Sequence, residues 1–238
     1  MSHWYGLDGN PMYSIVGANG KERATTLRDA RKLDLVPSVT TIMKVAAAPA
    51  LETWKINKAI QATRENPDAS DNEIRFLSSQ EAKDAASRGT EIHDMIEQGF
   101  KGESNAPYEA VRASLSDLFP EVEGWVAEES FASPEGYGGK IDLYHESGII
   151  VDFKTKDNLD IEAPMKKLVF DNHGIQLSAY AQGIGMDNPT RVSVFVDRED
   201  PTKVVSHILE DTHVKHLGMF SCLLAYWKLS NNFGVSNG

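Results

Sequence analysis

Cysteine is almost absent from this chain, because Cys222 is the only one among 238 residues. An internal disulfide needs two cysteines and an iron–sulfur cluster is normally held by four, so the sequence excludes both. Apolar runs are short, and none approaches the ~18 residues of a membrane-spanning helix. The N-terminal residues lack the charged start and apolar stretch of a signal peptide. We therefore expect a cytoplasmic protein that does not contact a membrane.

Positive charge is also scarce in this sequence. It has 24 Lys and Arg against 35 Asp and Glu, a formal net charge of −11. Proteins that coat nucleic acid nonspecifically are usually basic, because contacts with phosphate dominate their affinity. The charge therefore argues against an architectural DNA-binding protein, but it allows a local basic strip beside an acidic centre. The sequence contains no internal repeat, low-complexity tract or Walker A motif.

Apolar periodicity and turn signals predict helices first and strands later. Residues 1–70 are expected to form a hairpin and helical region, and residues 71–238 one compact core. Within the core, helices are predicted at about 71–100, 107–120, 172–185 and from 211, and strands at about 122–131, 137–144, 148–155, 191–196 and 203–209. This order indicates an α/β fold with a mixed central sheet flanked by helices.

One predicted hairpin, residues 137–156, concentrates charged side chains. Its Glu-Ser-Gly segment suits a three-residue loop, with Gly148 in the position that requires a positive φ. In that register Asp142 faces Asp152 and Lys140 faces Lys154. Strand alternation then places all four side chains on one side of the sheet.

Two directly opposed aspartates repel each other unless a cation lies between them. Asp142, Asp152 and the backbone carbonyl of Phe153 offer oxygen ligands for one or two Mg²⁺ or Mn²⁺ ions. Lys154 can orient an attacking water or neutralise charge on a phosphate. The alternative is a surface hairpin with ordinary charges, but the apolar neighbours indicate a buried strand and favour a site.

Two further patterns flank this hairpin: Gly89-x-x-x-His93 before it and Gln176-x-x-x-Tyr180 after it. By itself His93 is either a metal ligand or a satisfied buried histidine, and Gln176 with Tyr180 is either a polar helix edge or a substrate contact. The order of His, acid, acid-x-Lys and Gln-x-x-x-Tyr extends over residues 75–186. It resembles the PD-(D/E)XK nuclease superfamily, and in particular its RecB-like and phage-type exonuclease branch, which includes the mitochondrial genome maintenance exonuclease.

The resemblance implies a restriction-endonuclease-like core and a Mg²⁺- or Mn²⁺-dependent exonuclease that acts on DNA ends in recombination, repair or DNA turnover. It implies catalytic roles for Asp142, Asp152, Lys154, Gln176 and Tyr180. It also implies metal ligation by His93, Asp142, Asp152, Phe153 and an additional acid, for which we favour Glu129 over Glu128 by strand alternation. Some relatives carry an iron–sulfur cluster, which Cys222 alone cannot hold. The resemblance places the enzyme in the cytoplasm of a bacterium or phage-infected cell, with any helicase or recombination partner on a separate chain.

The N-terminal third is similar to segments of phage-encoded and mitochondrial exonucleases, in which a helical arch confines the DNA. Lys55 and Lys58 are expected to belong to such a basic wall, and Lys140 and Lys156 to contact DNA nearer the acids. Four aromatic residues could stack on bases or lie in the core: Trp4, Tyr5, Trp54 and Phe76. Two alternatives remain open, a structure-specific endonuclease and a non-cleaving DNA-binding module. The sequence leaves open the polarity of digestion, the strand preference and the oligomeric state.

Overall fold

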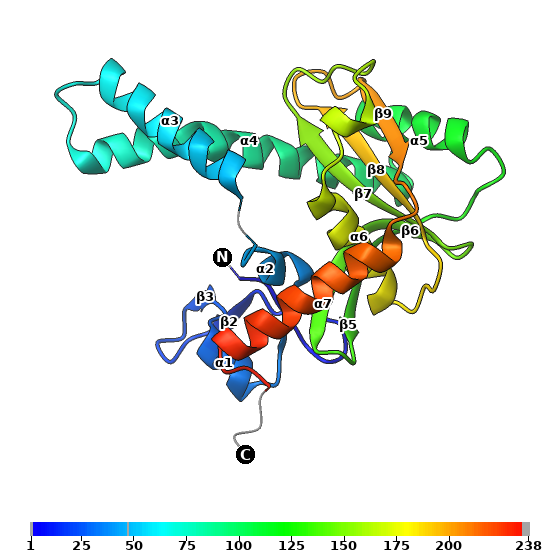
Figure 1. The fold of residues 1–238 in the computed structure, drawn as a ribbon, viewed down its shortest axis with the longest axis horizontal. Coiled ribbons are helices and arrows are strands. Elements are labelled where there is room, and N and C mark those ends of the chain that lie inside the picture. Colours follow the sequence, from blue (N-terminus) through cyan, green and yellow to red (C-terminus); the bar gives the residue numbers. More distant parts are fainter. Residues whose placement is uncertain (1, 47, 235–238) are drawn as a thin grey trace.

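The computed structural model describes residues 2–46 and 48–234, and its centre is a single five-stranded sheet in the order β5-β6-β7-β8-β9 (Figure 1). The strands are β5 (Val126–Ser133), β6 (Tyr137–His145), β7 (Ile149–Lys156), β8 (Thr190–Asp197) and β9 (Val204–Ile208). Neighbouring strands are antiparallel except β7 and β8, which are parallel. The predicted mixed α/β architecture is confirmed.

The parallel pair requires a crossover connection, which residues 157–189 supply. This connection contains the short helix η1 (Met165–Lys167) and the helix α6 (Asp171–Gly183). Every residue of β8 from Arg191 to Asp197 is buried. A strand buried on both sides is expected where helices cover both faces of a sheet.

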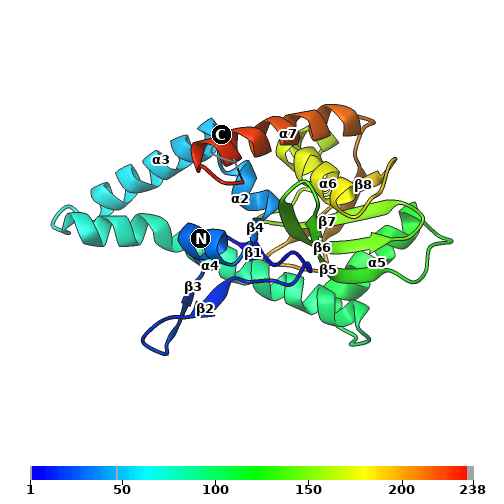
Figure 2. The same ribbon diagram turned by 90° about the horizontal axis from the view of Figure 1, so that it is seen from below.

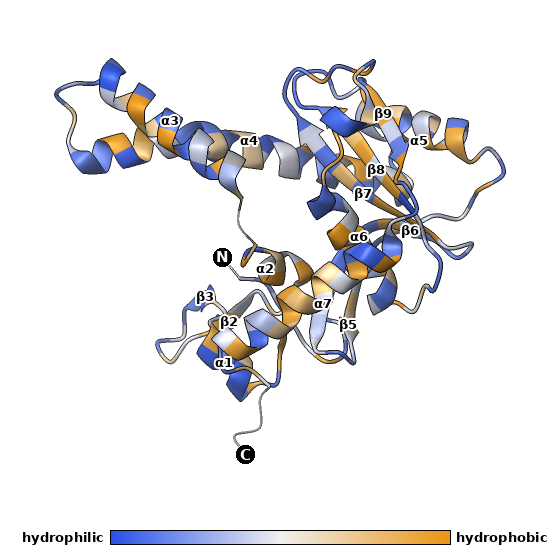
Figure 3. Ribbon diagram, viewed as in Figure 1, coloured by the Kyte–Doolittle hydropathy of each residue, from blue (hydrophilic) through white to orange (hydrophobic). Residues whose placement is uncertain are grey.

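Two apolar cores lie on the two faces of this sheet. On one face, Ile141 and Ile150 pack with residues of α6 and α7 (His213–Ser230), including Leu177 and Phe220. On the other, the core joins strand residues to α5 (Ala106–Leu118) and to the C-terminal half of α4 (Asp71–Phe100): Leu143, Val151, Val192, Val194, Ile92, Ile96, Val111 and Leu115. Figure 3 shows apolar residues in β8, between these layers.

The N-terminal segment packs on the same body. β1 (Trp4–Tyr5) pairs with β4 (Val36–Pro37) and β2 (Ser14–Val16) with β3 (Glu22–Ala24), and the helices α1 (Leu27–Lys32) and α2 (Val39–Met43) complete the segment. Trp4 is 1% exposed, and its ring centroid lies 6.0 Å from Trp227 and 5.7 Å from Phe233. Tyr5 is buried as well. These two aromatic residues therefore belong to the packed body, and they are not available to stack on bases.

α3 (Pro49–Glu65) and the first half of α4 project from the body as an antiparallel helical arm (Figures 1 and 2). Among the residues of α3 whose burial is described, Ala62 alone is buried. Ile56 and Phe76 are more than half exposed, at 59% and 58%. The arm thus contributes little to the apolar cores. No helix in the described part of the chain combines the length and apolar character needed to cross a bilayer.

Candidate active site

The β6–β7 hairpin separates into a fork at the predicted acids. The pairs His145–Ile149, Tyr144–Ile150 and Leu143–Val151 confirm the predicted register, and Gly148 has the expected positive φ of 89°. The ladder ends after Leu143–Val151. Asp142 Oδ2 instead accepts a hydrogen bond from the Phe153 backbone N–H at 2.7 Å. A side chain therefore replaces the next ladder contact, and the two acids lie where the strands part.

Asp152 lies at the base of this fork in a hydrogen-bonded cluster with α6. Its side chain is 2% exposed. Lys154 Nζ lies 2.6 Å from Asp152 Oδ2 and donates to Gln176 Oε1 at 3.1 Å. Gln176 Nε2 donates to Asp152 Oδ1 at 2.7 Å and lies 3.3 Å from the Tyr180 hydroxyl. The structure thus brings together four of the residues expected in the site, two from β7 and two from α6, the helix of the crossover that follows it.

His93 approaches the fork from α4, on the opposite side from α6. Its Nδ1 lies 4.0 Å from Asp142 Oδ2, and its ring packs edge-on against Phe153 with centroids 5.9 Å apart. Burial lowers the pKa of His93, so the imidazole is neutral at pH 7 and offers a nitrogen lone pair. Gly89, one turn earlier, permits this approach, since a Cβ there would lie 2.8 Å from Thr155 Oγ1. The neighbour at Gly89 is therefore the side chain of Thr155.

Of the two acids considered for the additional ligand, Glu128 lies at the fork, whereas the favoured Glu129 points away from it. The β5–β6 ladder pairs Ala127 with Leu143 and Glu129 with Ile141, but forms no pair at Glu128. Glu128 has a φ of 61°, which interrupts the alternation on which the expectation depended. Its carboxylate pairs with Lys140 and lines the same cleft as Asp142, whereas Glu129 is solvent-exposed. Burial, and then the Asp142 charge, raise the pKa of Glu128.

The predicted placement of Lys140 opposite Lys154 is also wrong. Lys140 pairs with Glu128 and lies 3.9 Å from Glu97 in α4, whereas Lys154 contacts Gln176 in α6. The alternation of β6 breaks at Asp142. Its neighbours Ile141 and Leu143 should share a face, yet they belong to the cores on opposite faces of the sheet.

The other lysines expected to contact DNA lie farther from the acids. Lys156 is the last residue of β7 and is half-buried. Lys55 pairs with Glu52 at 2.7 Å in α3, and Lys58 pairs with Glu81 and lies over the Trp54 ring. Acids therefore accompany the arm lysines, and the arm presents mixed charge where the sequence indicated a basic wall.

Groups around the fork are of the kinds that bind divalent cations. They are carboxylates, a neutral imidazole and a backbone carbonyl: Asp142, Asp152, Glu128, His93 and Phe153. Burial, and then the Asp152 charge, raise the pKa of Asp142 to about 7, so a nearby cation would stabilise its ionised form. Asp152 Oδ2 is buried, and the Lys154 ammonium at 2.6 Å is its close polar contact. Among the described residues, no three His, Cys, Asp or Glu side chains form a ready ligand cluster. Lys140 and Lys154 neutralise two of the acids, so an ion would compete with these lysine contacts.

A cleft of about 630 Å³ opens beside the fork, between α4 and the strands. Besides His93, Glu128, Lys140 and Asp142, its lining includes residues that no motif indicated: His3, Thr90, Asp94, Thr155 and Arg198. Arg198 donates to the Thr155 hydroxyl at 3.1 Å and carbonyl at 2.9 Å, and pairs with Asp157. The pairing of β7 with β8 is the signal that could have placed Arg198, because it follows the end of β8. His3 has no comparable signal in the sequence.

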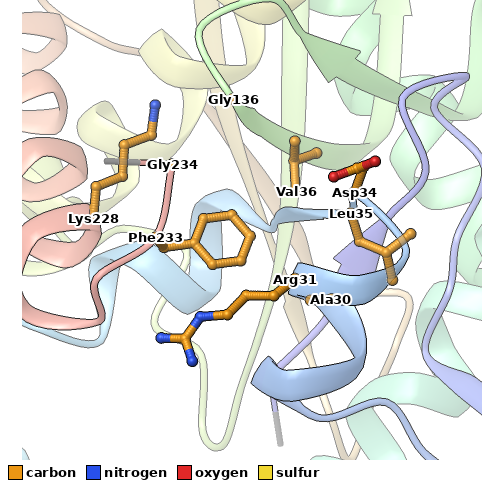
Figure 4. A pocket seen from close by; sticks show the side chains of 9 residues that line it. All are labelled: Ala30, Arg31, Asp34, Leu35, Val36, Gly136, Lys228, Phe233 and Gly234. Carbon is orange, nitrogen blue, oxygen red and sulfur yellow. The ribbon is translucent and has the colours of Figure 1, made fainter. Parts of the chain in front are cut away.

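A separate pocket of about 290 Å³ lies between α1, the C-terminal end of α7 and the turn after β5 (Figure 4). Its walls combine apolar residues with three charged ones: Ala30, Leu35, Val36, Phe233, Arg31, Asp34 and Lys228. None of the residues expected in the site lines this pocket. The fork and its cleft are therefore the candidate active site.

No protein-family model and no curated protein matches this sequence. Among solved structures, the chain is similar to an alkaline exonuclease, LHK-Exo, from Laribacter hongkongensis. The identity is 14% and the TM-score 0.44, over 82% of this chain and 89% of that chain. It is also similar to LHK-Exo in complex with dAMP, at 14% identity and a TM-score of 0.30, over 75% of this chain and 97% of that chain. Scores this low assign no family, so the side chains at the fork have to carry the functional assignment.

Proposed function

We propose that this chain is a metal-dependent DNA nuclease with a PD-(D/E)XK active site and a restriction-endonuclease-like core. One observation carries the proposal: the half-buried Asp142 and the buried Asp152, on neighbouring strands, lie where the strands separate, with Lys154 two residues after the second acid. Two desolvated carboxylates so close together destabilise an apo protein. A bound cation that contacts a phosphate substrate would offset this repulsion. An ordinary surface hairpin would have no reason to retain it.

The reaction is hydrolysis of a phosphodiester. The oxygen of a water forms a bond to phosphorus, one bridging P–O bond breaks, and the leaving oxygen takes up a proton. Asp142, Asp152, the Phe153 carbonyl, His93 and Glu128 would hold a divalent ion, which would supply Lewis-acid polarisation of the phosphate and a lowered pKa for a bound water. Lys154 orients the attacking water and offsets the charge that develops on the phosphate.

Gln176 and Tyr180 act from the other side of the fork. Gln176 holds Asp152 with its amide N–H and Lys154 with its amide oxygen. The two groups therefore keep fixed positions relative to each other while substrate binds. Tyr180 is 5% exposed, and burial raises its pKa. It stays protonated at neutral pH and supplies a hydroxyl proton near the phosphate.

We infer action from DNA ends, and the position of the arm supports this inference. α4 carries the arm at its start and His93 farther along, so the arm and the cleft adjoin (Figure 1). A strand that enters between them reaches the acids from a free end. Covalently closed circular DNA, whether single- or double-stranded, should therefore resist cleavage while linear DNA is degraded.

The test is degradation of end-labelled linear DNA, single- and double-stranded, in Mg²⁺, Mn²⁺ or EDTA. We expect metal-dependent cleavage by the wild type and a loss of at least about 100-fold in Asp152→Asn or Lys154→Ala. Asp187→Asn, an exposed aspartate, is the matched control and should remain active. Mn²⁺ should also raise the melting temperature, because a ligand at 100 times its dissociation constant adds about 2.7 kcal/mol.

Each alternative has its own outcome in this experiment. Rapid cutting of closed single-stranded circles would show an endonuclease and overturn action from ends. DNA binding without cleavage in any metal would indicate a non-cleaving module. Near-normal activity in both Asp152→Asn and Lys154→Ala would refute the site itself.

A further inference from the structure

His3 and Tyr13 form a stacked pair at the surface, with ring centroids 4.5 Å apart and planes at 28°. The pair is fixed at both ends. The backbone N–H of His3 donates to the Thr41 hydroxyl at 3.0 Å. The Tyr13 hydroxyl lies 2.6 Å from the hydroxyl of the buried Tyr5. The rings of Tyr13 and Tyr5 also pack edge-on against each other. The backbone of His3 and the side chain of Tyr13 are therefore both anchored before any ligand arrives.

This pair stands beside the acids. His3 lines the same cleft as His93 and Asp142. Tyr13 lies beside His3, because the two rings are stacked. Both rings remain accessible, since His3 is exposed and Tyr13 is 37% exposed.

Small side chains of α4 line the same cleft as His3. They recur on one helical face at Ala82, Ala85, Ala86, Gly89 and Thr90. They leave a cleft of about 630 Å³, which lies within the range of small-molecule sites. Burial, followed by the charge of Lys44, lowers the pKa of His3. The ring is neutral at pH 7 and presents an aromatic face where a phosphate ligand would need a cation.

We infer that His3, backed by Tyr13, is the stacking wall of a nucleobase subsite in this cleft, facing the small residues of α4. This inference rests on the proposed nuclease function and adds a base contact to it. The subsite takes an unpaired base from a nucleotide close to the scissile phosphate. A base inside a duplex is already paired and stacked, so occupation of the subsite requires single-stranded DNA or a frayed end.

The test measures the binding of a fluorescein-labelled oligothymidylate, with Ca²⁺ in place of Mg²⁺. Binding is also measured for a series of abasic versions of this oligonucleotide, each of which lacks a single base at a different position. Stacking of one base on an aromatic side chain contributes about 5- to 160-fold in affinity. The affinity of the wild-type protein should fall by about that factor when the base is missing at one position, and it should change little when the base is missing elsewhere. The affinity of His3→Ala for the intact oligonucleotide should be lower by the same factor. Removal of the base at that one position should not lower it further.

Companion variants separate stacking from folding. His3→Phe keeps an aromatic face and should retain the wild-type pattern, and Tyr13→Ala should weaken the same single position by removing support from His3. Tyr226→Ala removes an aromatic ring that is 62% exposed on α7 and should change nothing. The wild-type preference for single-stranded over blunt duplex DNA should shrink in His3→Ala.

Two results would overturn the subsite. One is that His3→Ala lowers the affinity for intact and abasic oligonucleotides equally, and the other is that it does not lower the affinity at all. If DNA is still bound and cut in either case, only the subsite fails. If the protein neither binds nor cuts DNA, the proposed nuclease function fails with it.

Discussion

Gln176 donates a hydrogen bond from Nε2 to Asp152 Oδ1 at 2.7 Å, so α6 fixes an acid that belongs to β7. Its Oε1 accepts from Lys154 at 3.1 Å. One amide therefore holds an acid and the lysine that follows it. Because Asp152 is buried, it has no water that could replace a lost donor.

We predict that Gln176→Ala lowers kcat about 10- to 100-fold with a smaller change in KM, as for other residues that orient metal ligands. Gln176→Glu should be at least as harmful, because it adds a third carboxylate beside Asp152. Steady-state kinetics on linear DNA measures both. Gln182→Ala, an exposed glutamine of the same helix, is the control. Wild-type kcat in Gln176→Ala would show that α6 does not position the site.

The stability of the apo protein should fall as pH rises toward 7, because of Asp142. Burial and the Asp152 charge raise its folded-state pKa to about 7, whereas an unfolded aspartate titrates near 3.9. The contribution of Asp142 is therefore fully present below pH ~4 and is lost as pH rises through ~7. Asp142→Asn should remove this component and make the apo protein more stable than wild type at pH 8. Urea denaturation in EDTA across this range measures the difference, and parallel curves for the two proteins would contradict it.

Glu128 and Glu129 provide a matched pair of substitutions. Glu128→Gln should lower metal-dependent activity about 10-fold or more, since its carboxylate lies in the cleft with Asp142 and pairs with Lys140. Glu129→Gln should be almost neutral, because that side chain is solvent-exposed. Titration of Mn²⁺ against activity measures both. A larger effect from Glu129 would restore the assignment that strand alternation favoured.

Gly89 is expected to tolerate no larger residue. Its added Cβ would lie 2.8 Å from Thr155 Oγ1, so Gly89→Ala should destabilise the protein by about 1–3 kcal/mol. Gly218→Ala is the control, because that helical glycine has no neighbour within 4 Å of a Cβ. It should stabilise α7 by about 0.5–1 kcal/mol. Thermal melting compares them, and addition of Thr155→Ala to Gly89→Ala should recover part of the loss.

Much of the fold could be predicted from local patterns. Gly148 sets the hairpin loop, and with it the pairing of His145 with Ile149. Helical spacing places His93 one turn after Gly89, and Gln176 one turn before Tyr180. These relationships depend on residues a few positions apart, so the periodicity of helix and strand is enough to predict them.

The sequence by itself was enough to identify the two candidate acids, the lysine that follows the second one, and the order of elements that brings α6 against β7. Only the tertiary structure decided which side chains share the fork. The positive φ of Glu128 and the break of alternation at Asp142 moved Glu128 into the site and turned Lys140 toward α4. The packing of the N-terminal strands on the body brought His3 into the same cleft. Strand alternation cannot predict such placements, because they depend on where β6 and β7 separate and on contacts between segments far apart in the chain.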